Sequence, residues 1–229
     1  MGFQNGWRGP DIVSDGLVLY MDAGSPNSYR TDFGNTWKDM SGNGNNGTLT
    51  NGPAFNSGSG GSIMFDGVND YSSHGYVTQL YNTKTITYNL WLKWNTLNAN
   101  RIVIGNENYG SVCFGIRQRS DNSYWISPGI GVAYIIRIIP GVDTTKAHMI
   151  TALTDGANAS FYVNGSFISS SAYSTTFTSQ ATFYVGIGYA DSFVEAFAGN
   201  INNVSIYNKA LSAQEVLQNY NAQKSRFGL

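Results

Sequence analysis

The sequence predicts an all-β fold, a sandwich or a barrel, with one short C-terminal helix. Short apolar or alternating runs recur at near-regular spacing, which is typical of sandwiches and barrels. Clusters of Gly, Asn, Asp and Ser separate these runs and supply turn residues. A single segment near the C-terminus carries the signals of a helix. These three observations favour one large β domain.

Strands are predicted where apolar residues alternate or cluster between turn signals. In chain order, the segments are residues 17–21, 62–65, 86–93, 101–104, 112–117, 124–127, 130–139, 147–154, 159–163, 166–170, 182–186 and 198–207. Strict alternation fails within residues 201–207, which predicts a bulge or an edge position there.

Turn residues connect several of these segments. The pair Asn164-Gly165 predicts a two-residue hairpin, because both central positions of a type I′ turn need a positive φ. The same hairpin signal is given by Asp66-Gly67 and Asp155-Gly156.

The helix is predicted to begin at a capping box. The hydroxyl of Ser212 can accept a hydrogen bond from the amide of Glu215, and the Glu215 carboxylate can accept one in return. Val216, Leu217 and Tyr220 then form an apolar stripe, so a helix of about ten residues is expected to pack on the sandwich edge.

No break in composition divides the chain. We expect an extended N-terminal arm over residues 1–14, the sandwich over residues 15–222, and a tail without assigned structure over residues 223–229. Residues 1–10 contain no apolar run of the kind that a secretory signal peptide carries.

The composition is neutral and rich in amides. Charged residues make up 12% of the 229 residues, the net charge is −1, and the chain has 25 Asn and 27 Gly. A near-neutral chain lacks the basic footprint that nucleic acids or anionic membranes require. No apolar run approaches the roughly 20 residues of a spanning helix, so membrane insertion is not expected. The single cysteine, Cys113, excludes an internal disulfide.

Several motifs, taken together, resemble the laminin-G-like (concanavalin A-like lectin/glucanase) superfamily. They occupy residues 16–22, 37–45, 65–71, 85–91, 148–156, 162–165, 197–201 and 206–215, in the order found in that family. The resemblance implies a two-sheet antiparallel jelly-roll sandwich, in agreement with the strand pattern. The opening at residues 12–20 is also similar to versions of this domain in tailed-phage virion proteins. Many family members have Trp immediately before the histidine that matches His148, whereas this chain has Ala147.

Because the superfamily includes retaining glucanases, an enzyme has to be considered. Retaining hydrolysis needs two carboxyl groups about 5–5.5 Å apart. Glucanases of this fold carry them in a Glu-x-Asp-x-x-Glu run, which this chain lacks. Its only glutamates are Glu107, Glu195 and Glu215, which lie far apart in the sequence. We therefore expect no catalytic residues and no enzyme activity, and we expect His148 to be a structural hydrogen-bonding residue.

One loop has the spacing of a calcium site. Oxygen-bearing side chains alternate at Asp39, Ser41, Asn43 and Asn45. Hard oxygen donors suit calcium, but Thr50 stands where a calcium loop has its bidentate glutamate. A turn in which side chains bond backbone groups is therefore favoured over calcium, which stays the alternative. No other cofactor is expected.

Two regions are candidates for carbohydrate binding. By alternation, Trp91 lies on the strand face opposite Ile86, Tyr88, Leu90 and Leu92, which form the better core set. Trp91 is then either an outward ring for a sugar or a packing residue of the family motif, and packing is favoured. A second, polar and aromatic stretch offers another recognition edge, although an ordinary solvated hairpin is favoured there. It comprises Arg119, Asp121, Asn122, Tyr124 and Trp125.

One predicted strand is apolar on both faces. An antiparallel sandwich normally leaves one strand face in water, so this strand needs a cover from its own chain or from a neighbour. Its candidate interface residues are Ile130, Val132, Tyr134, Ile136 and Ile138.

Two functions follow as expectations. The first is a non-enzymatic structural protein of a phage virion, in head decoration or in a tail or fibre. Its partners would be other virion proteins or further copies of itself, for example in a trimer, with contact to host glycans as an added role. The alternative is a carbohydrate-binding module that is extracellular or on a cell surface. A glycoside hydrolase ranks third.

Overall fold

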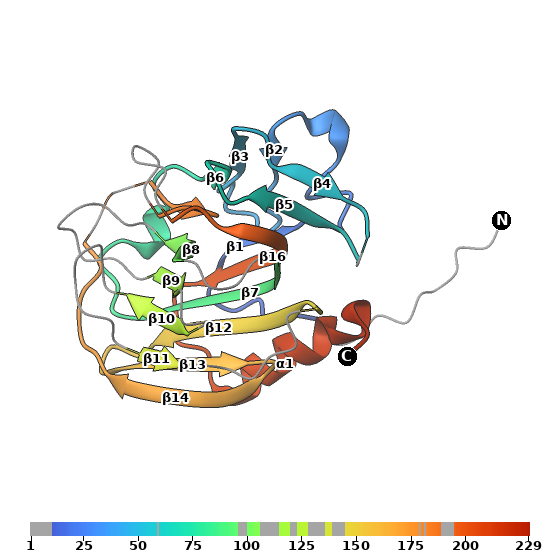
Figure 1. The fold of residues 1–229 in the computed structure, drawn as a ribbon. Helices are drawn as coiled ribbons and strands as arrows, with labels where there is room; N and C mark the ends of the chain where they lie inside the picture. The colour runs from blue at the N-terminus through green and yellow to red at the C-terminus, as the bar shows by residue number, and fades with distance from the viewer. Residues whose placement is uncertain are drawn as a thin grey trace.

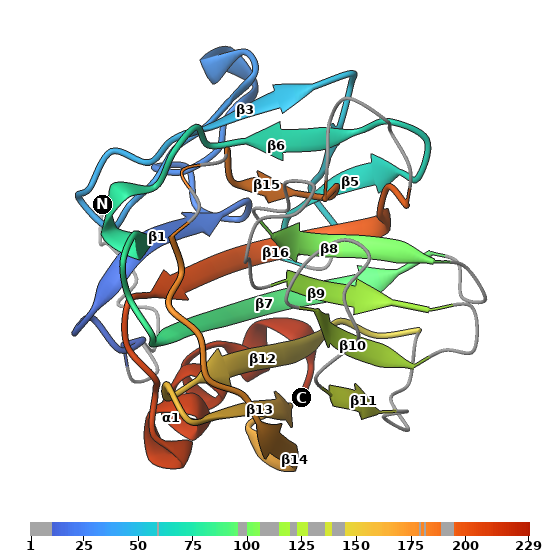
Figure 2. The ribbon, with the colours of Figure 1, turned by 90° about the vertical axis from the view of Figure 1, so that its left-hand side faces the viewer.

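The computed structural model of the chain describes residues 11–58, 60–95, 100–105, 115–119, 123–127, 136–138, 145–178, 180, 182–188 and 195–229. These residues form two antiparallel sheets with a shared apolar core and one C-terminal α-helix (Figure 1). Figure 2 shows the second sheet lying in front of the first. The predicted fold class is confirmed.

The first sheet has the strand order β14-β13-β12-β7-β16-β5-β4, and β1 pairs with β16. Its strands are β1 (Leu17–Asp22), β4 (Ala54–Asn56), β5 (Ser62–Asp66), β7 (Ile86–Trp94), β12 (His148–Thr154), β13 (Asn158–Val163), β14 (Ser166–Ala172) and β16 (Ala198–Tyr207).

The second sheet has the order β11-β10-β9-β8-β15-β6-β3-β2. Its strands are β2 (Thr36–Trp37), β3 (Gly47–Thr50), β6 (Tyr71–Ser73), β8 (Arg101–Gly105), β9 (Gly115–Gln118), β10 (Tyr124–Ser127), β11 (Ile136–Ile138) and β15 (Tyr184–Val185). The helical segments are η1 (Thr31–Phe33), η2 (Thr78–Leu80), α1 (Ala213–Gln223) and η3 (Lys224–Phe227).

Every predicted strand segment overlaps a strand of the structure, and residues 124–127 and 198–207 match β10 and β16 at both ends. Parts of two other segments, residues 112–114 and 130–135, lie outside the described residues. The strands β2, β3, β4 and β6 were not predicted. They contain two to four residues and few consecutive apolar side chains, so only pairing with neighbouring strands defines them.

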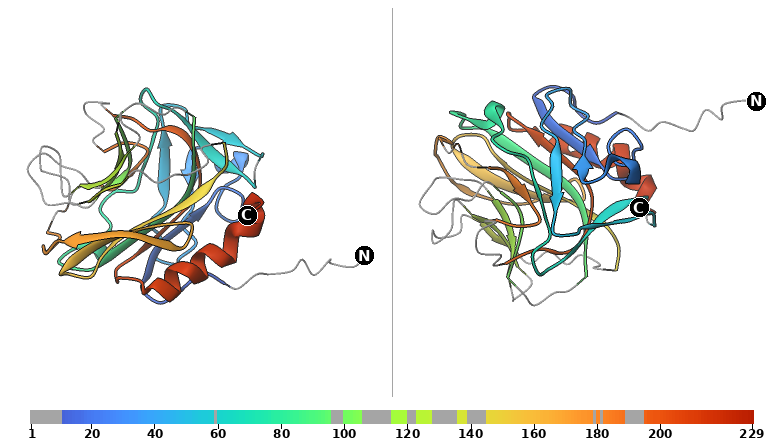
Figure 3. Two further views of the ribbon diagram at one scale, coloured as in Figure 1. Left: turned by 60° about the horizontal axis from the view of Figure 1, so that its bottom comes forward. Right: turned by 90° about the horizontal axis from the view of Figure 1, so that it is seen from above.

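The outer and inner faces of β7 are both buried, but in different cores. Ile86, Tyr88, Leu90 and Leu92 point into the main core between the sheets, as predicted. Trp91 points the opposite way, into a second cluster with Met149, Tyr162, Tyr207 and Val216. The left view of Figure 3 shows α1 along this outer side of the first sheet. The helix therefore covers a sheet face, and the expected position at the sandwich edge is wrong.

The hairpin at Asn164-Gly165 is confirmed, with φ values of 51° and 78°. Asp155-Gly156 also joins two paired strands, β12 and β13. Asp66-Gly67 is different, because β5 belongs to the first sheet and β6 to the second. The predicted hairpin there is wrong, and the connection instead carries the chain from one sheet to the other.

The predicted bulge in residues 201–207 is also present. The register of β16 on β7 shifts between Ile201 and Asn203, so Asn202 is the extra residue. The strand is central, because β7 pairs along one side while β5 and β1 share the other.

The predicted capping box is present. The Ser212 hydroxyl accepts a hydrogen bond from the Glu215 amide, and the Glu215 carboxylate accepts one from the Ser212 amide at 2.8 Å. Val216 is fully buried, whereas Leu217 is 46% exposed, so Leu217 does not belong to the buried stripe. The next buried position after Val216 is a polar residue, Asn219, which accepts a hydrogen bond from the Val13 amide and donates one to the Tyr207 hydroxyl.

Replacing Ser212 by alanine is expected to lower the free energy of unfolding by about 1 kcal/mol, because the amide of the first helical turn loses its acceptor. Urea denaturation monitored by circular dichroism measures the change. Ser212→Thr keeps the hydroxyl and is the control. Equal destabilisation by both substitutions would contradict a capping role.

The first described residues and the C-terminal segment both pack near the helix. Of the predicted arm, residues 11–14 are described, and Val13 is buried against α1. The predicted tail is ordered as η3, in which Phe227 stacks on Trp91 at a centroid distance of 4.3 Å. Arg226 Nη1 forms an ion pair with Asp22 Oδ2 at 2.7 Å and so fixes η3 to β1. Among the described residues, no helix is long and apolar enough to cross a membrane.

Candidate functional site

Two adjoining recesses open on the outer side of the first sheet. The amide recess, of about 60 Å³, is lined by Asn56, Ser62, Lys93, Ala147, Asn200 and Asn202. The basic recess, of about 160 Å³, is lined by Lys93, Thr145, Lys146, Ala147, Arg226 and Phe227. Because Lys93 and Ala147 line both, the two recesses adjoin, and together they are called the hollow beside η3.

Strand register places the amide recess. Lys93 lies opposite Asn200 on β16, which lies opposite Met64 on β5. Directly paired residues point to the same face of a sheet. Leu92 and Ile201, one position away in each strand, belong to the main core, so this row faces outward. Asn56 and Ser62 are cross-strand partners in the next row.

The amide side chains in the recess support one another. Asn200 Nδ2 donates to Asn95 Oδ1 at 3.1 Å, and Ser62 Oγ donates to Asn200 Oδ1 at 3.2 Å. Asn202 Nδ2 donates to the carbonyl of Gly61 at 2.8 Å. An amide has two N–H donors and two acceptor lone pairs, so these hydrogen bonds leave Asn200 with one donor and one acceptor position for another partner. The row is thus held in place while it can still bond an incoming hydroxyl.

An apolar patch borders this polar row. Met64 is 40% exposed and lies beside Asn200 across β5 and β16. Apolar surface next to hydrogen-bonding amides suits a sugar, which has hydroxyl edges and C–H faces.

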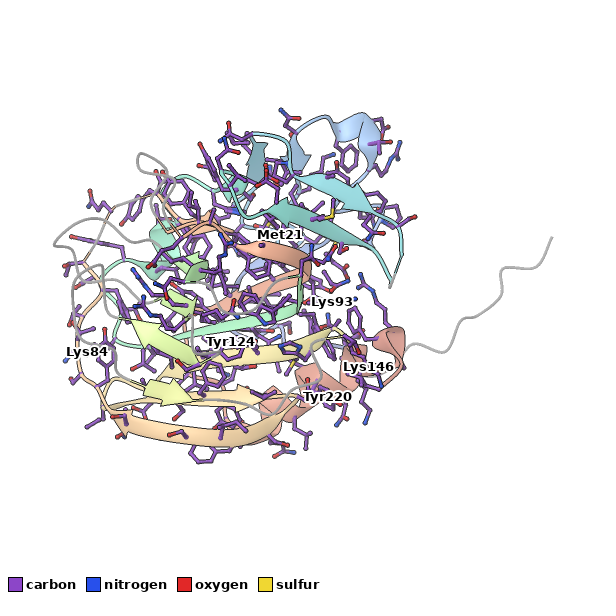
Figure 4. All side chains as sticks on the ribbon, in the orientation of Figure 1. Met21, Lys84, Lys93, Tyr124, Lys146 and Tyr220 are labelled. Atoms are coloured by element: carbon purple, nitrogen blue, oxygen red, sulfur yellow. The ribbon has the colours of Figure 1, made fainter. Side chains whose placement is uncertain are left out.

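The C-terminal segment forms part of the wall of the basic recess. Arg226 donates from Nε to the Gly60 carbonyl at 2.8 Å, in addition to its ion pair with Asp22. The ring of Phe227 forms part of the wall and is held from below by Trp91. Figure 4 shows Lys93 and Lys146 on the same side of the molecule, next to this segment. Among the residues that the structure describes, no carboxylate lines either recess.

Trp91, a predicted sugar-stacking candidate, is fully buried. Its ring lies 4.3 Å from Phe227 and 5.7 Å from Tyr220, measured between centroids, and is nearly parallel to both. The packing role that the sequence favoured agrees with this position. A sugar could reach Trp91 only if η3 and α1 moved away.

The second predicted recognition edge is divided by the fold. Tyr124 is buried between the sheets, and its hydroxyl contacts Trp94 Nε1 and, at 3.2 Å, His148 Nε2. Arg119 lies at the second sheet, where its Nη1 is 3.3 Å from Glu195 Oε1. Asp121 and Asn122 lie outside the described residues, and for Trp125 only the backbone in β10 is described. Tyr124 is therefore a core residue, and the predicted edge does not form one described surface.

The side chains of the predicted calcium loop form hydrogen bonds with backbone amides and with one another. Asp39 Oδ1 accepts hydrogen bonds from the amides of Tyr20 and Ser41, and Asp39 Oδ2 accepts one from the amide of Asn45 at 2.9 Å. Asn43 Nδ2 donates to Ser41 Oγ at 3.0 Å. The favoured interpretation as a turn fits these contacts. No group of three or more His, Cys, Asp or Glu suited to a metal occurs in the described part of the chain.

The predicted apolar interface is mostly outside the described structure. Ile130, Val132 and Tyr134 are not described, and Ile136 and Ile138 are described only as backbone of β11. The strand β11 is at the edge of the second sheet. What covers this strand stays a prediction.

The glutamates are distributed over separate sites. Glu215 is held in the capping box, and a hydrogen bond from Lys209 keeps its pKa below the ordinary value. Glu195 bridges Arg117 and Arg119 at the second sheet. Glu107 lies outside the described residues.

The sequence did not single out the residues of the recesses. Strand alternation places Lys93 on the same outward face as Trp91, two positions before it. It places Asn200 on the face opposite the core residue Ile201. The meeting of β7, β16, β5 and η3 had no sequence signal, because these segments are far apart in the chain.

Comparison with known families gives one match over most of the chain. The family described as concanavalin A-like lectin/glucanases superfamily matches residues 65–217. A search of curated protein sequences finds no match.

Solved structures with a similar fold come from several organisms. Domain 4 of an extracellular arabinanase from Geobacillus stearothermophilus, in complex with arabinotriose, has a TM-score of 0.69 and 18% identity, covering 89% of this chain and 98% of that domain. A Trypanosoma rangeli sialidase in complex with sialic acid has a TM-score of 0.69 and 16% identity, covering 93% of this chain and 34% of the sialidase. The binding domain of Paraclostridial Mosquitocidal Protein 1 has a TM-score of 0.68 and 16% identity, covering 91% and 52%. At these identities the likeness establishes the fold alone.

Proposed function

The chain belongs to the concanavalin A-like lectin/glucanases superfamily, and from this premise we propose that it is a carbohydrate-binding module without catalytic activity. The observation that carries the proposal is the outward pair of Asn200 and Ser62 in the amide recess, with Asn200 held by a hydrogen bond to Asn95. Fixed amides with spare hydrogen-bonding capacity, next to the exposed Met64, suit the hydroxyls and C–H faces of a sugar.

Two further points support a binding role. The arabinanase domain that shares the fold was solved with arabinotriose, and 98% of that domain is covered by this chain. The described lining of the recesses offers hydrogen-bond donors and ammonium groups and contains no carboxylate, whereas retaining hydrolysis needs a pair of carboxylates. Membership in a phage virion stays a prediction from the sequence resemblance.

Binding can be measured by a glycan array followed by isothermal titration calorimetry, with arabinotriose among the first probes. Asn200→Ala is expected to weaken binding about tenfold, because it removes hydrogen bonds worth about 1.4 kcal/mol together. Asn27→Ala removes an amide from an exposed turn outside the recess and is the matched control.

Two results would overturn the proposal. Absence of binding to every saccharide at millimolar concentration would remove the lectin function. Loss of binding in Trp125→Ala with full binding in Asn200→Ala would move the site to the second sheet, which contains β10.

A further inference from the structure

The lysines of the basic recess differ from the other cations of the protein. Of the eleven Lys and Arg side chains that the structure describes, eight contact a carboxylate, a backbone carbonyl or an aromatic ring. Within this described set, the exceptions are Lys84, Lys93 and Lys146. Two of these three unpaired ammonium groups line the same recess.

Within the described part of the chain, no carboxylate at the recess compensates this charge. The described lining residues include Lys93, Lys146 and Arg226, and none of them is acidic. Asp22 offsets only Arg226, to which it is paired at 2.7 Å. The whole chain has a net charge of −1, so a local excess of positive charge at a hollow is not a general property of the surface.

Lys93 lies where the two recesses join. On one side of it are the neutral amides and hydroxyl of the amide recess, and on the other are Lys146 and Arg226. A ligand that fills both recesses must therefore present neutral hydroxyl groups next to an anionic group. A carboxylated sugar has this combination within a single unit.

We propose that the hollow beside η3 binds an acidic saccharide, with sugar hydroxyls at Asn200 and Ser62 and the carboxylate between Lys93 and Lys146. This inference rests on the proposed carbohydrate-binding function and specifies its ligand class. A nucleic acid is the weaker match, because a polyanion is held by many cations along a surface and here two unpaired ammonium groups meet at one small hollow.

The experiment compares an acidic oligosaccharide with its neutral form. Calorimetry of the full chain with trigalacturonate and with its methyl ester, at about 0.05 M salt, isolates the contribution of the carboxylate. The acid is expected to bind about tenfold more tightly than the ester. Raising the salt to about 0.5 M is expected to remove most of that difference, because ions screen partly exposed charges.

Matched variants locate the effect. Lys93→Gln and Lys146→Gln are each expected to weaken binding of the acid about fivefold while leaving the ester unchanged. Lys84→Gln removes the third unpaired ammonium, which lies on the opposite side of the molecule (Figure 4), and is expected to change neither. Thermal melting of each variant checks that folding is intact.

The outcomes separate the two proposals. Equal binding of acid and ester that depends on Asn200 but not on the lysines would overturn the acidic ligand and keep the carbohydrate function. Binding of inorganic phosphate as tight as that of trigalacturonate would show a simple anion site and overturn the saccharide. Absence of binding to either oligosaccharide, and to the wider glycan panel, would overturn both.

Discussion

Replacing Trp91 by alanine is expected to lower the free energy of unfolding by about 3–5 kcal/mol. The indole is fully buried, and it is the surface on which both Tyr220 and Phe227 stack. Its loss leaves a cavity between the first sheet and the C-terminal segment and removes two aromatic contacts. Urea denaturation monitored by far-UV circular dichroism measures the change, because this backbone signal does not rely on the tryptophan that is removed.

The same substitution also tests how the basic recess is built. Phe227 is part of the recess wall and rests on Trp91, so Trp91→Ala is expected to weaken binding of an acidic saccharide indirectly. Trp91→Phe keeps an aromatic surface and is the control, with a smaller loss of stability expected. A destabilisation below about 1 kcal/mol in Trp91→Ala would contradict the packing role.

Stability is expected to fall as the pH drops from about 6.5 to about 4, in part because of His74. Burial lowers the pKa of His74 from 6.5 to about 4. Its ring nitrogens lie 3.1 Å from Ser72 Oγ and 3.2 Å from the Asn45 carbonyl, between β6 and the Asp39–Asn45 turn. The neighbouring Asp39 carboxylate favours the protonated ring, but burial outweighs it.

The direction of the change in stability with pH follows from proton binding. Since the folded pKa is the lower one, the unfolded chain binds the proton more readily between pH 6.5 and pH 4. The contribution of His74 is complete above pH 6.5 and is lost as the pH falls toward 4. At about 1.4 kcal/mol per pH unit, the loss is about 3 kcal/mol.

Urea denaturation at a series of pH values tests this expectation, with His74→Gln as the comparison. The variant is expected to be less stable at pH 7 but to lose less stability on acidification than the native chain. Parallel stability profiles for the two proteins would show that another group carries the pH dependence.

The fold was largely predictable from local pattern, and particular residues show why. Alternation in β7 separates Leu90 from Trp91, and the positive φ of Asn164 and Gly165 closes a hairpin where the pair predicts one. The capping box at Ser212 begins the helix as expected. Each of these features is decided by interactions between residues a few positions apart.

Asp66-Gly67 shows the limit of such signals. The pair favours a tight turn, and Gly67 does adopt a φ of 81°. Whether the next strand pairs with β5 or crosses to the other sheet depends on long-range contacts that a dipeptide does not encode. The same limit applies to the expected edge position of α1, because the apolar residues that receive it are distributed over β7, β12, β13 and β16.

The sequence by itself determined the all-β class, the strand positions, the helix start and the family resemblance, because these depend on periodicity and short-range hydrogen bonding. Only the tertiary structure decided that Trp91 is covered by Phe227 and that Lys93, Lys146 and Asn200 meet at one hollow. Lys93, Lys146 and Asn200 are each more than fifty residues apart along the chain, and Phe227 lies more than a hundred residues after Trp91. Their proximity results from strand order and from the folding of the C-terminal segment onto the first sheet, and no local pattern specifies either.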